Sequence, residues 1–327
     1  MSERALLSTR KGLFELQRSP AGWEIGPVHF LGEPVSIALA DARDGSMYAA
    51  LNLGHFGVKL HRKDPGSAAW TEIAVPAYPP KPADSTDTVD WNNKLIWSLE
   101  TGGADEPGVL WAGTLPGGLF KSSDRGDSWE LVRPLWDVPE RASWFGGGYD
   151  VPGIHSICVD PRDSRHILVG VSCGGAWRTL DGGASWNVSS TGMRADYMPP
   201  EMNENEAVQD PHRIVRSAGS PDVMWCQHHN GMWRSENDGR RWTEITNVPL
   251  SNFGFAVAAH PTDGNTAWFA PAEADQRRVI GLEYTEQSGG GTIPEAQLRF
   301  YLDQVRMSNW GFQQIRNDIA QSLGGNG

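Results

Sequence analysis

The sequence has few of the features that disulfide-bonded or membrane-spanning proteins need. Its 327 residues include only three cysteines, Cys158, Cys173 and Cys226, and their spacing matches no metal-binding motif. An odd number of cysteines predicts reduced, buried thiols and a cytoplasmic protein. The first residues lack the apolar core of a signal peptide, and no run of about 18 apolar residues is present, so we expect no membrane span.

Basic residues are also scarce. Lys and Arg together number 28 against 40 Asp and Glu, which gives a formal net charge of −12. Because this charge opposes binding to phosphate backbones and anionic lipids, neither nucleic acid nor a membrane is expected as the main partner. Glycine and tryptophan are abundant instead, with 38 and 15 residues, which suits many short strands joined by tight turns.

One motif, Ser/Thr-x-Asp-x-Gly-x-x-Trp, organises the chain. It occurs at residues 122–129 and 179–186 and, with Asn in place of Asp, at 235–242. Looser copies end at Trp23 and Trp70. The tryptophans that end these copies are 47, 59, 57 and 56 residues apart. This spacing predicts a repeat architecture in which each unit packs against its neighbours.

The residue types of the motif predict a turn that holds the fold. A short carboxylate accepts hydrogen bonds from N–H groups of its own turn, and glycine permits a positive φ there. The tryptophan is then expected to bury its ring under the hairpin. The residues predicted to act in this way are Ser122, Asp124, Gly126, Trp129, Thr179, Asp181, Gly183, Trp186, Ser235, Asn237, Gly239 and Trp242.

These motifs resemble the Asp box, or BNR repeat, of the sialidase-like and glycosyl-hydrolase-like β-propellers. The resemblance covers residues 1 to about 280 and implies an all-β propeller of four-stranded antiparallel blades, seven in the family. Strand patterns mark about six blades in this chain, and the first blade lacks its innermost strand. The resemblance does not extend to the Arg-Ile-Pro segment or the three-arginine cluster of sialidases, so sialidase activity is not expected.

The pattern changes towards the end of the chain. From residue 285 a Gly-rich joint leads into two amphipathic segments, one with Leu298, Leu302 and Val305 on one face and one with Phe312, Ile315, Ile319 and Leu323. We therefore divide the chain into a propeller, 1–284, and a short α-helical tail, 285–327. The tail is either an unrelated end on an incomplete propeller or a cap that fills the open ring.

The geometry of an antiparallel four-stranded blade predicts where a ligand would bind. The loops before the first strand and the turn between the second and third strands share one face, here called the loop face, and the motif turns lie on the other. The long connections 74–93, 133–152 and 189–212 all reach the loop face. Its polar and aromatic residues suit a small hydroxylated ligand such as a carbohydrate. The predicted ligand-binding residues are Asn52, His55, Trp91, Asn93, Tyr149, His155, His212, His228, His229 and Asn230.

Three kinds of function stay open at this stage. A glycoside hydrolase needs two carboxylates that flank the scissile bond, and Asp90 and Asp150 are the candidates. No cofactor is predicted. A metal ion held by His155, His212 and His228 is an alternative, because imidazole nitrogens are good ligands for zinc and similar ions. The protein would then be a metal-dependent hydrolase or lyase. A non-catalytic scaffold that binds a protein partner is the third alternative. The sequence predicts no oligomeric state.

Overall fold

The computed structural model describes residues 3–248, 252–271, 275–308 and 312–324. Within these ranges the side chains of 275–279, 305–308, 312, 313 and 324 are not described, so the predicted positions of Val305 and Phe312 lie outside the described set. Contacts divide the chain into two compact units, Met1–Thr246 with Phe255–Phe269, and Asn247–Gly254 with Ala270–Gly327. Each unit is described by itself.

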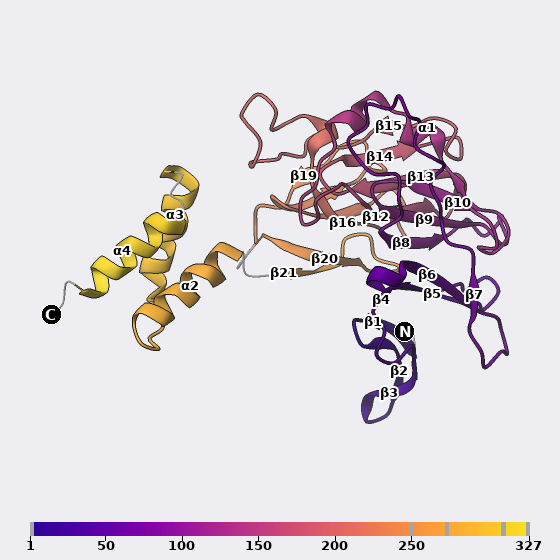
Figure 1. Cartoon of the computed structure of the whole chain (residues 1–327), viewed down its shortest axis with the longest axis horizontal. Coiled ribbons are helices and arrows are strands. Elements are labelled where there is room, and N and C mark those ends of the chain that lie inside the picture. Colours follow the sequence, from indigo (N-terminus) through magenta and orange to yellow (C-terminus); the bar gives the residue numbers. More distant parts are fainter. Residues whose placement is uncertain (1–2, 249–251, 272–274, 309–311, 325–327) are drawn as a thin grey trace. The chain divides into compact units, whose positions relative to one another are not determined.

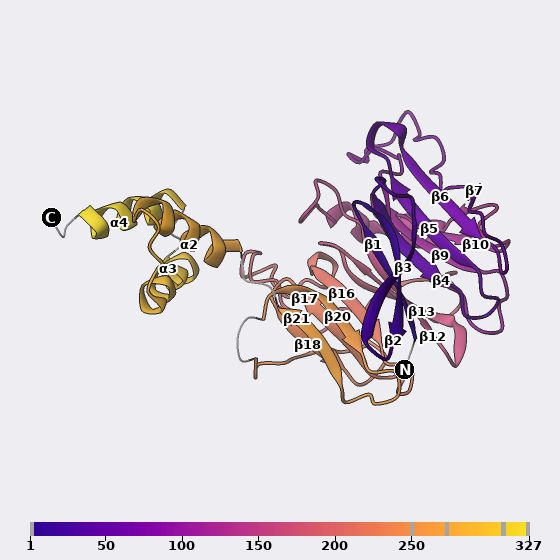
Figure 2. The same ribbon diagram turned by 90° about the horizontal axis from the view of Figure 1, so that it is seen from below.

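Antiparallel sheets follow one another in chain order through the first unit, as the colours of Figures 1 and 2 show. The first sheet is β1 (Arg4–Thr9), β2 (Gly12–Ser19) and β3 (Gly22–His29). The second is β4 (Val35–Ala40), β5 (Met47–Asn52), β6 (Val58–Lys63) and β7 (Thr71–Ile73), with the 3-10 turn η1 (Gly54–Phe56) inside it. The third is β8 (Leu95–Thr101), β9 (Leu110–Leu115), β10 (Leu119–Ser122) and β11 (Glu130–Leu131).

Short helices and two further four-stranded sheets complete most of this unit. After α1 (Arg133–Trp136) and η2 (Pro139–Ser143), the fourth sheet is β12 (Ile154–Asp160), β13 (Asp163–Val171), β14 (Gly175–Thr179) and β15 (Asn187–Val188). After η3 (Glu206–Val208), the fifth is β16 (Pro211–Arg216), β17 (Met224–His228), β18 (Gly231–Ser235) and β19 (Thr243–Glu244). A two-stranded sheet, β20 (Gly254–Ala259) and β21 (Ala267–Pro271), follows.

Packing between successive sheets makes them the blades of a propeller. The innermost strands contact one another in order, β4 with β8, β8 with β12 and β12 with β16. Side chains alternate along each second strand, so Val169 joins the core towards the third blade while Leu168 joins the core towards the fifth. Each apolar cluster therefore lies between two blades, and each blade depends on its neighbours for burial.

The blade count differs from the prediction of about six visible blades. The structure has five, of which the first has three strands, as its sequence indicated. The predicted sixth blade consists only of β20 and β21 among the described residues. The strand pattern ends there because the chain turns into α2 (Asp275–Gln287), which begins before the boundary expected at residue 285.

The three motif turns share one hydrogen-bond pattern. In the turn after β14, Thr179 Oγ1 donates to Asp181 Oδ1 at 2.7 Å and accepts from Gly183 N at 2.9 Å. Asp181 also accepts from Ser185 N at 2.9 Å. Equivalent bonds join Ser122, Asp124, Gly126 and Ser128 after β10, and Ser235, Asn237, Gly239 and Arg241 after β18. Gly126, Gly183 and Gly239 have φ of 87°, 96° and 74°, which only glycine adopts readily.

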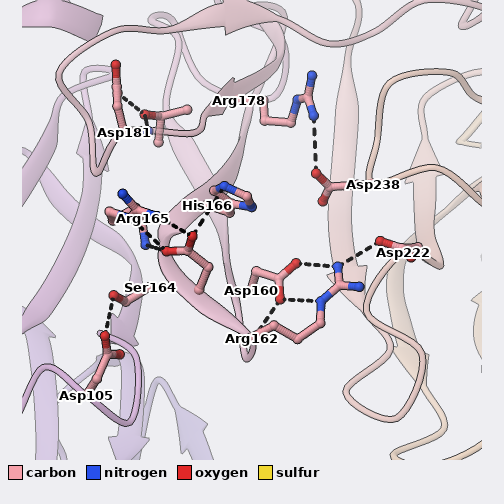
Figure 3. A network of polar contacts seen from close by, with 12 residues as sticks. Asp105, Asp160, Arg162, Ser164, Arg165, His166, Arg178, Asp181, Asp222 and Asp238 are labelled. Carbon is pink, nitrogen blue, oxygen red and sulfur yellow. Dashed lines mark hydrogen bonds and ion pairs between the residues drawn. The ribbon is translucent and has the colours of Figure 1, made fainter.

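Ion pairs connect the blades on the side of the motif turns (Figure 3). Arg162 donates to Asp160 in its own turn and to Asp222 of the next blade, both at 2.7 Å. Arg178 contacts Asp238 of the next blade at 3.2 Å. Arg216, only 5% exposed, lies against both Asp160 and Asp238 at 3.2 and 2.7 Å. These charges are satisfied within the fold, so this network is structural.

The second unit contains α2, α3 (Glu295–Ser308) and α4 (Phe312–Gly324). Ile280, Leu298, Tyr301, Ile315 and Ile319 form its buried cluster, with Leu302 and Leu323 packed against it. The amphipathic faces predicted for the tail thus bury one another, which is how short helices without long-range sheet pairing are stabilised. None of the described helices combines the length and apolar character needed to cross a membrane.

Candidate functional site

A β-bulge recurs at the loop-face end of the innermost strands. The pairing register shifts between Val35 and Ile37 in β4, and at the corresponding places in β8, β12 and β16. The residues at the bulges of these four blades are Ser36, Trp97, His155 and His212. A bulge turns one side chain out of the regular alternation, so each blade presents a distinctive residue here. Rings of neighbouring blades contact one another here. The ring centroids of Trp97 and His155 are 5.6 Å apart.

Asp210 is the centre of a polar cluster on this face. Its Oδ2 lies 3.3 Å from His212 Nε2 and 3.6 Å from His229 Nδ1. Its Oδ1 accepts from Cys173 N at 3.0 Å and from Ser172 Oγ at 3.2 Å. Burial alone would raise the pKa of Asp210, but the hydrogen bond and charge of His212 outweigh it and hold that pKa below its usual range. The carboxylate is therefore ionised at neutral pH.

Two of the other three predicted histidines, His155 and His228, are buried. Burial lowers the pKa of His155 and of His228 to about 3, so both are neutral at physiological pH. His155 Nδ1 contacts Ser156 Oγ at 2.8 Å, and the amides of Asp210 and Asn230 lie 3.0 and 2.9 Å from the ring nitrogens of His228. The predicted trio of His155, His212 and His228 is therefore not a ligand set. His212 instead groups with Asp210 and His229, whose potential ligand atoms all lie within 4.8 Å of one another.

Aromatic rings border this cluster. Tyr197 is 37% exposed, and its ring meets His229 at 5.2 Å and Phe145 at 6.3 Å between centroids. The Tyr197 hydroxyl donates to Val208 O at 2.8 Å, which fixes the ring in place. Asn230 Oδ1 accepts from Asp196 N at 2.9 Å, so the 189–212 loop is joined to the turn between β17 and β18 beside the ring. Asp210 and Tyr197 are not predicted as ligands from the sequence, because neither belongs to a recognisable motif.

Tyr149 lies at another part of the loop face. It is 48% exposed and packs edge-on against Trp97, with centroids 5.1 Å apart. No described contact joins Tyr149 to the Asp210 cluster.

Several other predicted ligand residues have roles within their own loops. Trp91 Nε1 donates to Asp87 Oδ2 at 2.8 Å, and Asn93 bonds to Pro76 O at 2.9 Å. Asn52 Oδ1 accepts from Gly54 N at 3.3 Å, while His55 is exposed and meets the Phe56 ring edge-on, with centroids 5.8 Å apart. These residues shape the loop face, and no described contact joins them to the Asp210 cluster.

The predicted catalytic carboxylates, Asp90 and Asp150, lie on exposed loop positions before β8 and β12. Neither lines the cavity of about 420 Å³ that lies along the innermost strands β8, β12 and β16. That cavity is lined instead by Glu100 and Arg213 among others, and burial raises the pKa of Glu100. No motif in the sequence indicates this cavity, because Glu100 and Arg213 belong to ordinary strand patterns.

The arginines of this cavity do not form a free carboxylate-binding group. Arg43 is held by Asp41 at 2.7 Å and by carbonyls of the next blade, including Gly102 O at 3.1 Å. Arg216 is held by Asp160 and Asp238.

Comparison with known proteins gives relatives among glycan-cleaving enzymes. No family model matches the chain. A xyloglucanase of Paenibacillus sp is 28% identical over 226 residues, covering 62% of this chain and 20% of the relative. A probable oligoxyloglucan-reducing end-specific xyloglucanase of Neosartorya fischeri is 26% identical, covering 57% of this chain and 25% of the relative. The chain thus spans about a quarter or less of these curated relatives.

A solved structure shares the fold. The GH74 enzyme of Niastella koreensis aligns with a TM-score of 0.54 and 16% identity, over 84% of this chain and 40% of the other. This likeness supports the propeller architecture of the chain.

Proposed function

We propose that this chain is a glycoside hydrolase-like β-propeller of the Asp-box type that binds a carbohydrate on its loop face, beside Tyr197. The observation that carries the proposal is the fixed and exposed Tyr197 ring next to His229, Asn230 and the Asp210 cluster. An aromatic face with a few directed polar groups is the combination that hydroxylated ligands require. The xyloglucanase names of the relatives point to β-linked plant polysaccharide as the substrate class.

The ring of Tyr197 supplies the apolar surface of this site. Its hydroxyl is engaged with Val208 O, so the ring pays little conformational entropy when a sugar packs on it. Around it, His229 is 42% exposed and the Arg194–Asp196 ion pair is open to solvent. These groups offer hydrogen bonds to sugar hydroxyls at the edge of the platform.

Hydrolysis is the second part of the proposal. Asp90 and Asp150 remain the proposed carboxylates, since both lie on the long loops of the binding face. A retaining or inverting mechanism would need them about 5 to 10 Å apart in the complex. Asp90→Asn and Asp150→Asn should each abolish release of reducing sugar while binding is retained.

The binding test is calorimetric titration of the whole chain with xyloglucan oligosaccharides and, separately, with cello-oligosaccharides. We expect Tyr197→Ala to raise Kd by at least about tenfold, equivalent to ~1.4 kcal/mol. Trp23→Ala is the matched control, because this ring is 51% exposed on β3 of the first blade. Unchanged binding by Tyr197→Ala, or no binding of either sugar series by the parent chain, would refute the proposal.

A second candidate function is a non-catalytic scaffold. It is favoured by exposed apolar side chains on the first blade, which include Leu7, Trp23, Ile25 and Leu31. A group of this kind marks a protein-binding surface more often than a solvated one. If a second copy of the chain occupies it, sedimentation velocity should show a dimer that Trp23→Ser with Ile25→Ser converts to monomer. A monomer at all concentrations would contradict self-association through this surface.

A further inference from the structure

We propose that Asp210, His212 and His229 form a binding site for one divalent transition-metal ion, with zinc as the best match. The inference rests on the geometry of these three side chains and does not depend on carbohydrate binding. Imidazole nitrogens with one carboxylate oxygen are a ligand set that suits zinc and its neighbours in the first transition row.

The distances fit a shared ion. With metal–ligand bonds of about 2.0 to 2.1 Å, the ligands of a tetrahedral ion lie about 3.3 Å from one another. Asp210 Oδ2 lies 3.3 Å from His212 Nε2 and 3.6 Å from His229 Nδ1. The two histidine rings are nearly perpendicular, at 87°, with centroids 5.4 Å apart. All three ligand atoms lie within 4.8 Å of one another, and the two distances from Asp210 Oδ2 are already close to the tetrahedral value.

The surroundings hold each ligand in orientation. Ser172 Oγ and Cys173 N donate to Asp210 Oδ1, which leaves Oδ2 facing the imidazoles. The His212 ring stacks on Phe255 at 4.7 Å with a tilt of 12°, and the His229 ring rests edge-on against Tyr197. Hydrogen bonds and packing of this sort around the ligands of an ion normally raise its affinity.

One side of the site stays open. The Asp210 and His212 side chains are 5% and 10% exposed, whereas His229 is 42% exposed. Three protein ligands with a solvent-facing side are typical of zinc sites that keep one position for water or a substrate. An ion here would therefore carry an exchangeable ligand, and a hydroxylated molecule on the loop face could reach it.

A carboxylate between two histidines could instead be only a hydrogen-bonded group. The chain contains a simpler case for comparison, since His166 Nε2 lies 3.5 Å from Asp163 Oδ2 on the opposite face. That pair has one histidine and no second imidazole within the described contacts. It provides a matched control at a similar distance.

The experiment is equilibrium dialysis of the whole chain against Zn²⁺, with metal content measured by mass spectrometry, and titration with Co²⁺ followed by visible absorption. We expect one ion per chain and the intense visible bands of tetrahedral Co²⁺. His229→Ala should weaken binding by about 100-fold or more, and Ser172→Ala by about 10-fold through the orienting bond. His166→Ala should bind as the parent does.

Folding is checked separately for each variant. His212 is buried against Phe255, so His212→Ala needs its circular dichroism compared with that of the parent, whereas the more exposed His229→Ala carries the main test. The inference is overturned if the parent chain takes up no stoichiometric metal. It is equally overturned if folded His229→Ala retains parental affinity and cobalt spectrum.

Discussion

At the scale of single residues, burial separates histidines that the sequence places together. His155, His212, His228 and His229 all lie at strand ends on the loop face, as their positions indicated. The structure encloses His155 and His228 and leaves His229 partly exposed. This difference in exposure depends on side chains from neighbouring blades and on the β-bulges of the innermost strands. The residue pattern of one strand therefore does not predict it.

The enclosed histidines predict a loss of stability in mild acid. The folded-state pKa of His228, about 3, lies below the unfolded value of 6.5, so the unfolded chain binds more protons between these limits. Stability is therefore full above pH 6.5 and falls as pH decreases, by at most ~1.4 kcal/mol per pH unit for each such histidine. Urea midpoints from pH 7.5 to 5 measure this slope.

His228→Gln should make that pH dependence shallower, and the exposed His55→Gln should leave it as in the parent. Equal slopes in all three proteins would contradict the assignment of His228 as a neutral buried group. The remaining slope of His228→Gln then contains the contributions of His155, His61 and His229, because burial lowers the pKa of each of them as well.

At the scale of elements, the motif turns were predictable and the bulges were not. Each motif turn closes within eight residues through bonds among its own members, so local sequence suffices to specify it. The bulges at Ser36, Trp97, His155 and His212 exist only in the pairing between two strands. Register depends on how two strands pair, so the residue types along one strand do not predict it.

Thr179→Val tests the turn with almost no change in side-chain volume. The substitution removes the buried oxygen that accepts from Gly183 N and donates to Asp181. We expect a loss of about 1 to 3 kcal/mol in the free energy of unfolding, because a buried N–H loses its partner. Thr243→Val, at an exposed position of β19, should have little effect. Denaturant unfolding followed by tryptophan fluorescence measures both.

At the scale of the whole molecule, the propeller architecture followed from the repeat spacing, but the number of blades did not. β20 and β21 have good strand patterns, yet the third and fourth strands that would complete a blade are replaced by helix. The ion pairs between blades could not be predicted from the sequence either. Asp160 and Asp238 are more than fifty residues apart in the chain and meet only through Arg216.

Arg216→Met should destabilise the propeller strongly. It keeps the apolar stem of the side chain but removes the cation that Asp160 and Asp238 share, so that Asp160 keeps only Arg162 and Asp238 only Arg178. We expect a loss of about 1.5 to 3 kcal/mol in the free energy of unfolding. Arg165→Met is the control, because Arg165 lies at the surface with Asp163 of its own turn. A calorimetric melting temperature unchanged by Arg216→Met would show that blade contacts do not depend on this pair.

The most direct test of carbohydrate binding on the loop face is hydrogen exchange with and without a xyloglucan oligosaccharide. We expect slower exchange in peptides that cover residues 194–212 and 228–231, with no change at the motif turns around Asp124 and Asp181. Protection confined to the motif turns, to the cavity beside Glu100, or absent throughout the chain would contradict it.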